Sequence, residues 1–350
     1  MTNLRWGILG TARIARKNWK GILHSGNSVL TAVASRDQQR SRQFIDECQR
    51  ENPFATAPTA LGSYEELLSS PDVDAVYIPI PTGLRKDWVV RAAKAGKHVL
   101  CEKPCGATVD DVREMIKACQ KNHVQFMDGV MFMHNPRQDR IRQALDNGTS
   151  IGKLRRITSH FSFFTEDDFR QVNIRADGAT EPLGCLGDLG WYCIRFTLWA
   201  MNWKLPREVS GRILSQKGGD HSPRPVPFDF SAELFFDNDV SSGFFCSFLS
   251  AYSNWATVTG TKGYLRVPDF VLPAKTNHGA LDINGQLMDN SPVDPLTAQE
   301  TNMVRTFAGQ VLSGKLNEAW PDWALKTQIV INACLDSARS AQHVRLNDLK

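Results

Sequence analysis

Three short stretches of the chain combine side chains that could move a proton or hold a polar ligand. The first, Cys101-Glu102-Lys103-Pro104, ends an apolar run typical of a buried strand, so Lys103 is expected at the carboxyl end of that strand. A partly desolvated lysine in that position can hydrogen-bond a reacting hydroxyl and take part in acid–base chemistry. The alternative is an ordinary solvated lysine at a strand end.

The second stretch, 184–192, is rich in glycine and is expected to lead into a helix from Leu186 to Ala200. Asp188 and Tyr192 are four positions apart and would share one face of that helix. A carboxylate beside a phenol suits orienting a hydroxyl-bearing substrate and relaying its proton. Without such chemistry, Asp188 would be a charge in the first helical turn and Tyr192 a packed aromatic ring.

The third stretch, Met131-Phe132-Met133-His134-Asn135-Pro136-Arg137, falls where the character of the sequence changes. Its polar side chains are expected to face a ligand at a domain junction. A single histidine such as His134 also occurs as a structural residue with satisfied hydrogen bonds, and this alternative stays open.

The elements that must position these residues begin at the front of the chain. Trp6 to Leu9 predicts a buried strand, Gly10 breaks it, and apolar residues at helical spacing follow from Ile14. A strand, a tight turn of small residues and a helix N-terminus together form an anion site, as for the pyrophosphate in dinucleotide folds. The usual G-x-G-x-x-G pattern has the form Gly10-x-Ala12-x-x-Ala15 here.

Strands and helices alternate through the first third of the chain. The expected strands are 28–34, 74–79, 98–101 and 124–127, the expected helices are 36–50 and 84–95, and further helices start at the capping box Ser63–Glu66 and at 108–111. This alternation predicts a doubly wound parallel sheet that binds its ligand at the carboxyl ends of the strands.

Beyond about residue 130, long strands joined by turns replace this alternation. They are expected at 151–164, 208–215, 228–236, 240–248 and 255–267, the last of them folded into a hairpin, with helices at 186–200, 302–312 and 323–341. We therefore expect an α/β protein with a Rossmann domain over 1–128 and an α+β domain with a large, mostly antiparallel open sheet over 129–350. A C-terminal helix could pack back on the first domain. No element is assigned to 268–295.

Composition narrows the classes of partner. The formal charge of +4 in 350 residues, without a dense basic run, argues against nucleic acid as a ligand. No apolar stretch is long enough for a membrane span, and no signal-peptide core precedes the first strand. The eight cysteines include no C-x-x-C pair, so we expect reduced core thiols, a cytoplasmic location and no metal site.

Together these residues resemble the glucose–fructose oxidoreductase/inositol dehydrogenase (Gfo/Idh/MocA) family over essentially the whole chain. The resemblance is carried by Glu102-Lys103-Pro104 and by the glycine-rich D-x-x-x-Y helix at Asp188–Tyr192. Within the family the sequence is most similar to D-xylose dehydrogenases and dimeric dihydrodiol dehydrogenases. Many members have a histidine where this chain has Arg85, so a contact near the nicotinamide ribose or substrate is expected to differ.

The resemblance implies a Rossmann domain, a second domain with an open sheet, and a homodimer or higher oligomer formed through that sheet. It also implies that Lys103 and Tyr192 transfer the proton and that Asp188 helps to hold a sugar. The resemblance and the strand and turn patterns described above together give the expected cofactor-binding residues. They are Gly10, Thr11, Ala12, Arg13, Ile14, Ser35, Arg36, Pro79, Pro81, Thr82, Glu102 and Lys103. The expected substrate-binding residues are His134, Asn135, Arg137, Phe163, Asp188 and Trp191.

The end of the second strand bears on the choice of cofactor. An acid there would bond the ribose 2′-hydroxyl and repel a 2′-phosphate. This chain has Ala34-Ser35-Arg36, whose hydroxyl and guanidinium groups suit a phosphate, and Asp37 comes one position late. We therefore expect NADP in preference to NAD.

The expected activity is an NAD(P)-dependent dehydrogenase that oxidises an aldopyranose such as D-xylose, or a related cyclic polyol, at a CH–OH group. The alternative within enzymes is a trans-dihydrodiol dehydrogenase. Two other classes are a dinucleotide-binding regulator and an NAD-dependent glycosidase. The presence of Lys103, Asp188 and Tyr192 together argues against a regulator, which needs no proton relay.

Overall fold

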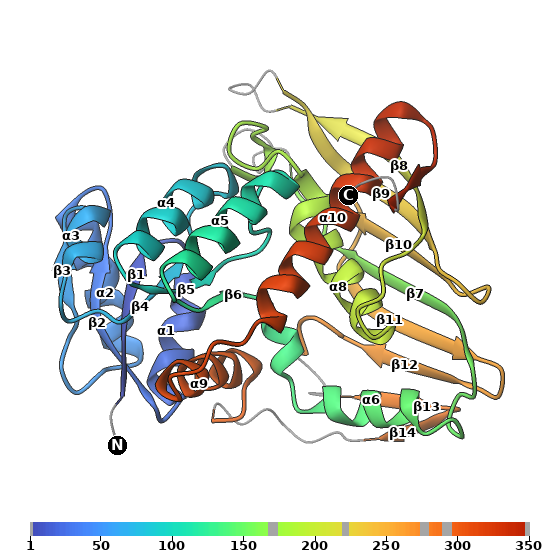
Figure 1. Ribbon diagram of the computed structural model, residues 1–350, viewed down its shortest axis with the longest axis horizontal. Helices are drawn as coiled ribbons and strands as arrows, with labels where there is room; N and C mark the ends of the chain where they lie inside the picture. Colours follow the sequence, from blue (N-terminus) through green and yellow to red (C-terminus); the bar gives the residue numbers. More distant parts are fainter. Residues whose placement is uncertain (1–2, 167–173, 219–223, 274–279, 289–295, 347–350) are drawn as a thin grey trace. The chain divides into compact units, whose positions relative to one another are not determined.

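The computed structural model describes residues 3–166, 174–218, 224–273, 280–288 and 296–346. The chain divides into two compact units (Figure 1). Unit 1 comprises Met1–Gly106, Asp110–Asn135 and Asp294–Ala324, and unit 2 comprises Ala107–Val109, Pro136–Val293 and Leu325–Lys350.

Unit 1 is built on a six-stranded sheet in the order β3-β2-β1-β4-β5-β6, in which every pair of neighbours is parallel. This is the strand order of dinucleotide-binding folds, and it confirms the predicted doubly wound sheet. The strands are β1 (Leu4–Leu9), β2 (Ser28–Ala34), β3 (Thr59–Leu61), β4 (Ala75–Ile78), β5 (His98–Cys101) and β6 (Phe126–Asp128).

Helices cover both faces of this sheet. Helix α9 packs against α1, and α4 and α5 lie beside each other on the other side of the sheet (Figure 1). The helices are α1 (Ala15–His24), α2 (Gln38–Glu51), α3 (Tyr64–Ser69), α4 (Thr82–Lys94), α5 (Val109–Lys121) and α9 (Gln299–Leu312), with the short 3-10 turn η1 (Met131–His134). Local signals explain several ends: the Ser63 hydroxyl accepts a bond of 3.1 Å from the backbone N–H of Glu66, and Gly96 takes a φ of +74° just after α4.

An aromatic cluster secures α9 in unit 1. Trp6 of β1 is fully buried, and its ring centroid lies 5.1 Å from that of Phe307 in α9. Phe307 in turn stacks on Trp320 with 6.2 Å between ring centroids. Aromatic pairs bury large apolar areas, so this cluster joins a late segment of the chain to its first strand.

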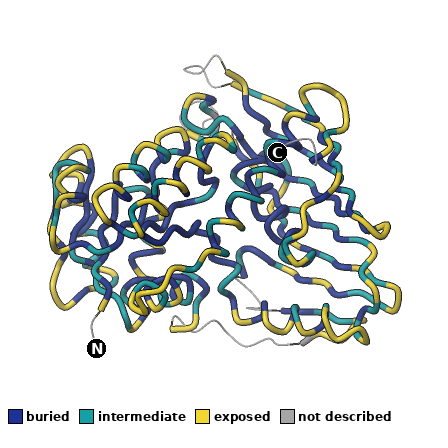
Figure 2. Tube along the Cα trace, viewed as in Figure 1, coloured by how far each residue is buried: buried dark blue, intermediate teal, exposed yellow. Residues whose placement is uncertain are grey.

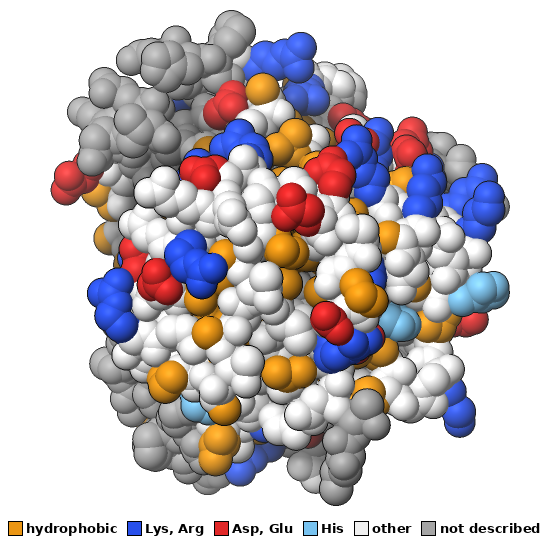
Figure 3. Space-filling view, turned by 90° about the vertical axis from the view of Figure 1, so that its left-hand side faces the viewer, with side chains coloured by type: hydrophobic (Ala, Val, Ile, Leu, Met, Phe, Trp, Pro, Cys, Tyr) orange, Lys and Arg blue, Asp and Glu red, His pale blue; other side chains and the backbone are white. Residues whose placement is uncertain are grey.

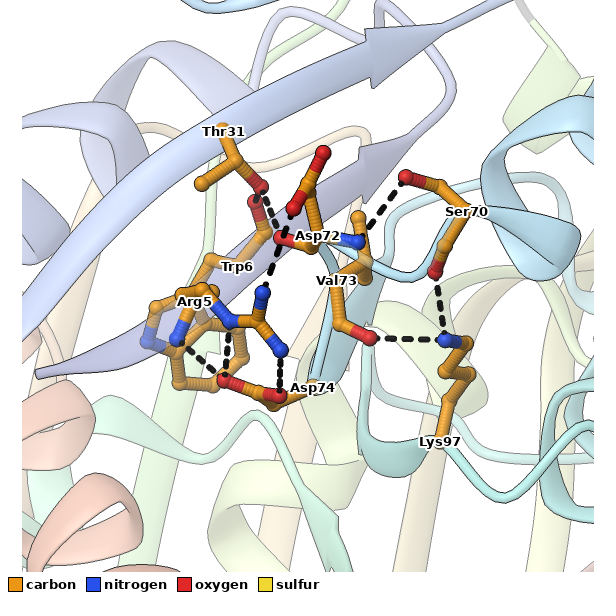
Figure 4. A network of polar contacts seen from close by, with 8 residues as sticks. All are labelled: Arg5, Trp6, Thr31, Ser70, Asp72, Val73, Asp74 and Lys97. Atoms are coloured by element: carbon orange, nitrogen blue, oxygen red, sulfur yellow. Dashed lines mark hydrogen bonds and ion pairs between the residues drawn. The ribbon is translucent and has the colours of Figure 1, made fainter.

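A polar network closes the edge of the sheet where the strands begin (Figure 4). The Arg5 guanidinium donates to both carboxylate oxygens of Asp74, at 2.7 and 3.0 Å, and Lys97 Nζ donates to the backbone oxygens of Ser70 and Val73, at 2.7 Å each. Burial lowers the pKa of Lys97. These residues precede or open β1, β4 and β5, so they lie at the opposite edge from the residues that follow the strands, and we assign them to stability.

Unit 2 is built on a nine-stranded sheet in the order β14-β13-β12-β11-β7-β10-β9-β8-β15. Among the described strands of this sheet, only β7 and β10 pair in parallel, which confirms the predicted open, mostly antiparallel sheet. The strands are β7 (Leu154–Ser162), β8 (Glu208–Lys217), β9 (Val226–Phe235), β10 (Ser241–Ser247), β11 (Ser253–Gly260), β12 (Tyr264–Pro268), β13 (Leu281–Ile283), β14 (Gln286–Met288) and β15 (Val344–Arg345). Of the stretch left without an expected element, 274–279 and 289–295 lie outside the described residues.

The two faces of this sheet differ. Helices α8 (Trp191–Ala200) and α10 (Ala319–Ser340) and the π-helical turn η3 (Leu186–Gly190) pack on one face. Along the strands of this sheet, buried residues alternate with more exposed ones (Figure 2). The other face carries half-exposed side chains in alternation, among them a stacked pair of His160 and Trp255 with 5.8 Å between ring centroids. Helix α6 (Arg137–Asp146) also belongs to this unit.

Within the described residues, no helix is both long and apolar enough to cross a membrane. On the face shown in Figure 3, the visible basic and acidic side chains are interspersed with each other. This is the distribution expected of a chain with a small net charge.

Candidate active site

The turn after β1 brings two loops of unit 1 together. Gly10 has a φ of +114°, and a Cβ there would lie 2.8 Å from Ile80 Cγ2. Only glycine combines this backbone conformation with so close an approach. Because Ile80 follows β4, the contact lies where the order of strands reverses, which is where open α/β sheets bind their ligands.

The backbone beyond Gly10 fits an anionic group. Helix α1 starts at Ala15 without a side-chain cap, and the described residues offer no acceptor to the backbone N–H groups of Ala12, Arg13 and Ile14. Thr11 and Ala12 are half-buried, whereas Arg13 and Ile14 are exposed. Donors at a helix N-terminus attract phosphate, so these residues suit the pyrophosphate of a dinucleotide.

The end of β2 supplies basic groups beside this turn. Ser35 is buried and its hydroxyl donates to the backbone oxygen of Asp37 at 2.6 Å, while the Asp37 carboxylate caps α2. Arg36 is exposed. Burial raises the pKa of the Tyr64 phenol, and the charges of Arg36 and Arg40 act on it in the opposite direction, so both arginines are close to it.

Tyr64 connects these arginines to the glycine turn. Its hydroxyl lies 3.6 Å from the position that a Cβ of Gly10 would occupy. Arg36, Arg40 and Tyr64 therefore form a positive, hydrogen-bonding corner next to the proposed pyrophosphate site, with the chemistry that a 2′-phosphate requires.

Lys103 is half-buried and follows β5, as predicted. The preceding Glu102 is buried, its Oε1 accepts a bond of 2.5 Å from the hydroxyl of Tyr77, and its Oε2 accepts one of 3.2 Å from the backbone N–H of Lys103. Tyr77 in turn accepts a bond of 2.8 Å from Asn18 of α1. Burial raises the pKa of Glu102, while the bond from Tyr77 and the charge of Lys103 oppose that shift. The Glu102 carboxylate thus joins Tyr77 of β4 to the backbone of Lys103 and holds the segment that carries this lysine.

The loop between β4 and α4 lies next to this segment. Pro79 is buried, Pro81 is half-buried, and Thr82 is buried with its hydroxyl accepting a bond of 3.0 Å from Arg85. Because β4 and β5 pair in parallel, their following loops meet at one edge of the sheet. Of the expected cofactor residues, unit 1 therefore brings Gly10 to Ile14, Ser35, Arg36, Pro79, Pro81, Thr82, Glu102 and Lys103 to this edge.

In unit 2, Asp188 forms an ion pair that the sequence did not indicate. Arg175 Nε, in the short 3-10 turn η2 (Ile174–Ala176), lies 2.9 Å from Asp188 Oδ2. The pKa of Arg175 is raised, first by the charge of Asp188 and then by Glu181 and Tyr192, against the effect of burial. Arg175 thus pairs with Asp188 and lies close enough to Tyr192 for the phenol to affect its pKa.

The helix that carries this pair begins differently from the prediction. Instead of one α-helix over 186–200, a π-helical turn spans Leu186–Gly190 and α8 follows. Gly184, just before it, has a φ of +50°, and a Cβ there would lie 2.3 Å from the backbone oxygen of Pro227. The π-helical turn contains Asp188, and such turns are frequent at functional sites.

The expected substrate-binding residues lie in two groups. His134 and Asn135 belong to unit 1, where His134 is half-buried and Asn135 is buried. In unit 2, Arg137 is buried and donates to the backbone oxygens of Pro268 and Asp269 at 3.2 and 2.7 Å, which holds that loop. Phe163 is half-buried against Phe248, and Trp191 is fully buried.

The sequence did not predict Arg40, Tyr64 or Arg175 as site residues, and it predicted for Arg85 only a changed contact near the nicotinamide ribose or substrate. Arg40, Tyr64 and Arg175 lie near partners that are distant in sequence, and no local pattern indicates such partners. Among the described residues, no group of three or more His, Cys, Asp or Glu side chains is placed to hold a metal ion.

Comparison with known proteins agrees with this architecture. Residues 4–130 match the model of an oxidoreductase family with an NAD-binding Rossmann fold, and residues 139–266 match the GFO/IDH/MocA C-terminal domain.

Two curated relatives and one solved structure illustrate the similarity. The chain is 36% identical over 346 residues to D-xylose 1-dehydrogenase (NADP(+)) 2 from Haloferax volcanii, which covers 98% of this chain and 100% of the relative. It is 32% identical over 305 residues to trans-1,2-dihydrobenzene-1,2-diol dehydrogenase from Mus musculus, covering 86% and 83%. It also resembles the structure of the 3-ketoreductase KijD10 from Actinomadura kijaniata in complex with NADP and TDP-benzene, with a TM-score of 0.80, 25% identity and coverage of 96% and 98%.

Proposed function

The chain belongs to the Gfo/Idh/MocA family of oxidoreductases, as its resemblance predicts, and on this premise we propose that it is an NADP-dependent dehydrogenase that oxidises an aldopyranose at C1. The observation that carries the proposal is the cluster of Arg175, Asp188 and Tyr192. A carboxylate held by an arginine accepts hydrogen bonds from the hydroxyls of a neutral sugar, and a phenol beside it can move a proton. The full-length similarity to a D-xylose dehydrogenase supports this substrate class.

We assign the cofactor to the strand ends of unit 1. Backbone N–H groups of Ala12 to Ile14 would bind the pyrophosphate, and Arg36 would bind the 2′-phosphate with Arg40 and Tyr64 beside it. Pro79, Pro81, Thr82, Glu102 and Lys103 would form the nicotinamide end. When bound, the nicotinamide ring exchanges a hydride with the substrate carbon.

We assign proton transfer to Lys103 and Tyr192. The proton of the reacting hydroxyl passes either to the Tyr192 oxygen or to Lys103 Nζ, and both assignments stay open. Asp188, His134, Asn135 and Phe163 are assigned to the substrate. Arg137 and Trp191 are assigned to the substrate as well; both are buried, and Arg137 donates to the backbone oxygens of Pro268 and Asp269.

The runner-up function is trans-dihydrodiol dehydrogenase, which the mouse relative favours. The same proton-transfer residues would serve it, on a more apolar ring. The aromatic side chains Phe161 and Phe163, near Tyr192 and Phe248 respectively, suit either substrate.

A panel of aldoses, inositols and dihydrodiols, each tested with NADP+ and NAD+ at the reduced-nicotinamide absorbance band, decides between these functions. We expect turnover with an aldopyranose and NADP+. Turnover of dihydrodiols alone would select the runner-up. An NAD-dependent glycosidase would retain its NAD through washing and would cleave glycosides without added cofactor. This result would select that function. Tight binding of NADP without turnover of any compound would favour a regulator.

We also propose a homodimer formed through the open face of the nine-stranded sheet. That face carries Phe245, His160 and Trp255 beside a concavity of about 320 Å³ lined by Tyr252, Trp255, Arg266 and Asp269, among other residues. A second copy would remove these aromatic side chains from water. The test is the molar mass from light scattering: a monomer at micromolar concentration, or a dimer unaffected by Trp255→Arg, would contradict this interface.

The structure describes all eight cysteines, and each is a buried thiol outside any disulfide. Free thiols persist in reducing compartments, so we propose a cytoplasmic location. Localisation of a tagged chain tests this.

A further inference from the structure

Arg85 occupies a position that is unusual for an arginine. It lies in the first turns of α4, and its side chain is only 6% exposed. A guanidinium group taken out of water costs free energy unless its donors find acceptors. The acceptors of Arg85 therefore indicate what this residue does.

Those acceptors come from two different loops. Arg85 Nε donates to the backbone oxygen of Ile80 at 2.7 Å, and Nη1 donates to Thr82 Oγ1 at 3.0 Å, both in the segment after β4. The same Nη1 donates to the backbone oxygen of Pro104, in the segment after β5. One side chain thus joins the loop after β4 to the residue that directly follows Lys103.

The electrostatic surroundings support this arrangement. The buried Glu102 carboxylate lies near enough for the Arg85 charge to oppose the rise of its pKa, which burial causes. Tyr77 holds the same carboxylate from the side of β4. The segment 102–104 is therefore fixed at both ends, by Tyr77 at Glu102 and by Arg85 at Pro104, and Lys103 lies between these two points.

We propose that Arg85 is a positioning residue that fixes the backbone carrying Lys103 by tying the loop after β5 to the loop after β4. The proposal rests on the proposed function, because that function gives Lys103 its part in proton transfer. Misplacing a reacting group by about 1 Å can cost about 10²-fold in rate. Loss of the tie therefore lowers kcat more than it changes the binding of substrate or cofactor.

The test compares Arg85→Met and Arg85→Lys with the matched control Arg91→Met. Arg91 lies on the same helix, but its side chain is exposed and pairs with Glu65 at the surface. We expect Arg85→Met to lower kcat by about 10²-fold, with the sugar KM and the NADP dissociation constant changed by less than about threefold. A lysine retains a charged donor, so Arg85→Lys should recover part of kcat, and Arg91→Met should equal the unchanged chain.

Hydrogen–deuterium exchange separates this proposal from the proposed function. Peptides that contain Lys103 and Cys105 should exchange faster in Arg85→Met than in the unchanged chain and in Arg91→Met, whether or not any sugar is turned over. Unchanged exchange in that segment would refute the tie, even in an active enzyme. Faster exchange with a normal kcat would refute the positioning role. If Arg85→Met fails to fold, the same two measurements on Arg85→Lys decide, with intermediate changes expected and no change counting against the proposal.

Discussion

Arg175 Nε lies 2.9 Å from Asp188 Oδ2, and this ion pair determines what Asp188 can do in the proposed reaction. An arginine partner favours the charged carboxylate, which accepts hydrogen bonds and does not donate a proton. Asp188 is therefore suited to hold substrate hydroxyls, and we assign proton transfer to Tyr192 or Lys103 instead. The Arg175 side chain is half-exposed, so we expect the ion pair to orient the Asp188 carboxylate and to contribute little to the stability of the fold.

Replacing Asp188 with Asn should raise the sugar KM more than it lowers kcat, since hydrogen bonds to a charged group are worth about 1.5–3 kcal/mol. Arg175→Gln should act in the same direction because it releases the carboxylate from its position. Steady-state kinetics with the preferred sugar measures both. The exposed Arg155 serves as control, and Arg155→Gln should change neither constant. A large loss of kcat at constant KM in Asp188→Asn would assign the proton transfer to this carboxylate instead.

Tyr192→Phe keeps the ring, which contacts Phe161 with 5.7 Å between centroids, and removes only the hydroxyl. If the phenol relays the proton, kcat/KM should fall by about 10²-fold or more and one limb of the pH–rate profile should disappear. The NADP dissociation constant should stay unchanged. A merely packed ring would instead lose about 0.5–1.5 kcal/mol of stability with little effect on turnover. A fully active variant with an unchanged pH profile would leave Lys103 as the proton acceptor.

Lys103→Met should lower kcat by about 10²–10⁴-fold, the usual contribution of a general acid or base. The dinucleotide site should remain, because Glu102 and Tyr77 still hold the neighbouring backbone. Cofactor fluorescence titration checks binding, and Lys94→Met, an exposed lysine on α4, is the matched control. Near-normal turnover would remove Lys103 from the mechanism.

Arg36→Ala should weaken NADP much more than NAD, because only NADP carries the 2′-phosphate. One charge-assisted contact is worth about 1.5–3 kcal/mol, so the NADP dissociation constant should rise by about 10- to 100-fold. Arg40→Ala should give a smaller change in the same direction. Calorimetric titration with both cofactors is the measurement. If Arg36→Ala weakened the binding of NADP and NAD equally, the assignment of the 2′-phosphate to Arg36 would be contradicted.

His98 should make the protein less stable in mild acid. Its Nδ1 accepts a bond of 2.9 Å from the backbone N–H of Gln125, and burial lowers its pKa. Below the unfolded-state pKa of about 6.5, the unfolded chain binds a proton that the folded chain refuses, so stability falls as pH decreases from there to the folded pKa. The slope for one such group is at most about 1.4 kcal/mol per pH unit.

Denaturant unfolding between pH 5 and about 7.5 measures this effect. His98→Asn removes the titrating group and should flatten the decline. Part of the decline in stability should remain in this variant, because burial also lowers the pKa of His160. A decline of the same slope in His98→Asn would assign the acid sensitivity to other groups.

Much of the framework could be predicted from the sequence because it depends on neighbours along the chain. Apolar runs, helical spacing and turn residues predicted five of the six strands of the parallel sheet, with β2 and β5 at their observed bounds, whereas the short strand β3 was not predicted. The same local logic placed Gly10 in a tight turn before a helix and Lys103 after a strand. In a parallel sheet the carboxyl ends of the strands lie at one edge, so the sequence also predicted the edge to which we assign the cofactor.

The partners of the polar side chains were decided only by the tertiary structure. Arg175 and Asp188 are thirteen positions apart, and the ion pair depends on how a loop returns to the π-helical turn. Likewise Arg85 could as well have been a solvated helical arginine, and only the closeness of Pro104 makes it a tie between loops. Helix α9 belongs to unit 1, where its Phe307 contacts Trp6, a residue 301 positions earlier in the chain. The periodicity of apolar residues predicts which face of a helix or strand is buried. It does not predict which other element covers that face, because this depends on contacts between residues that are distant in sequence.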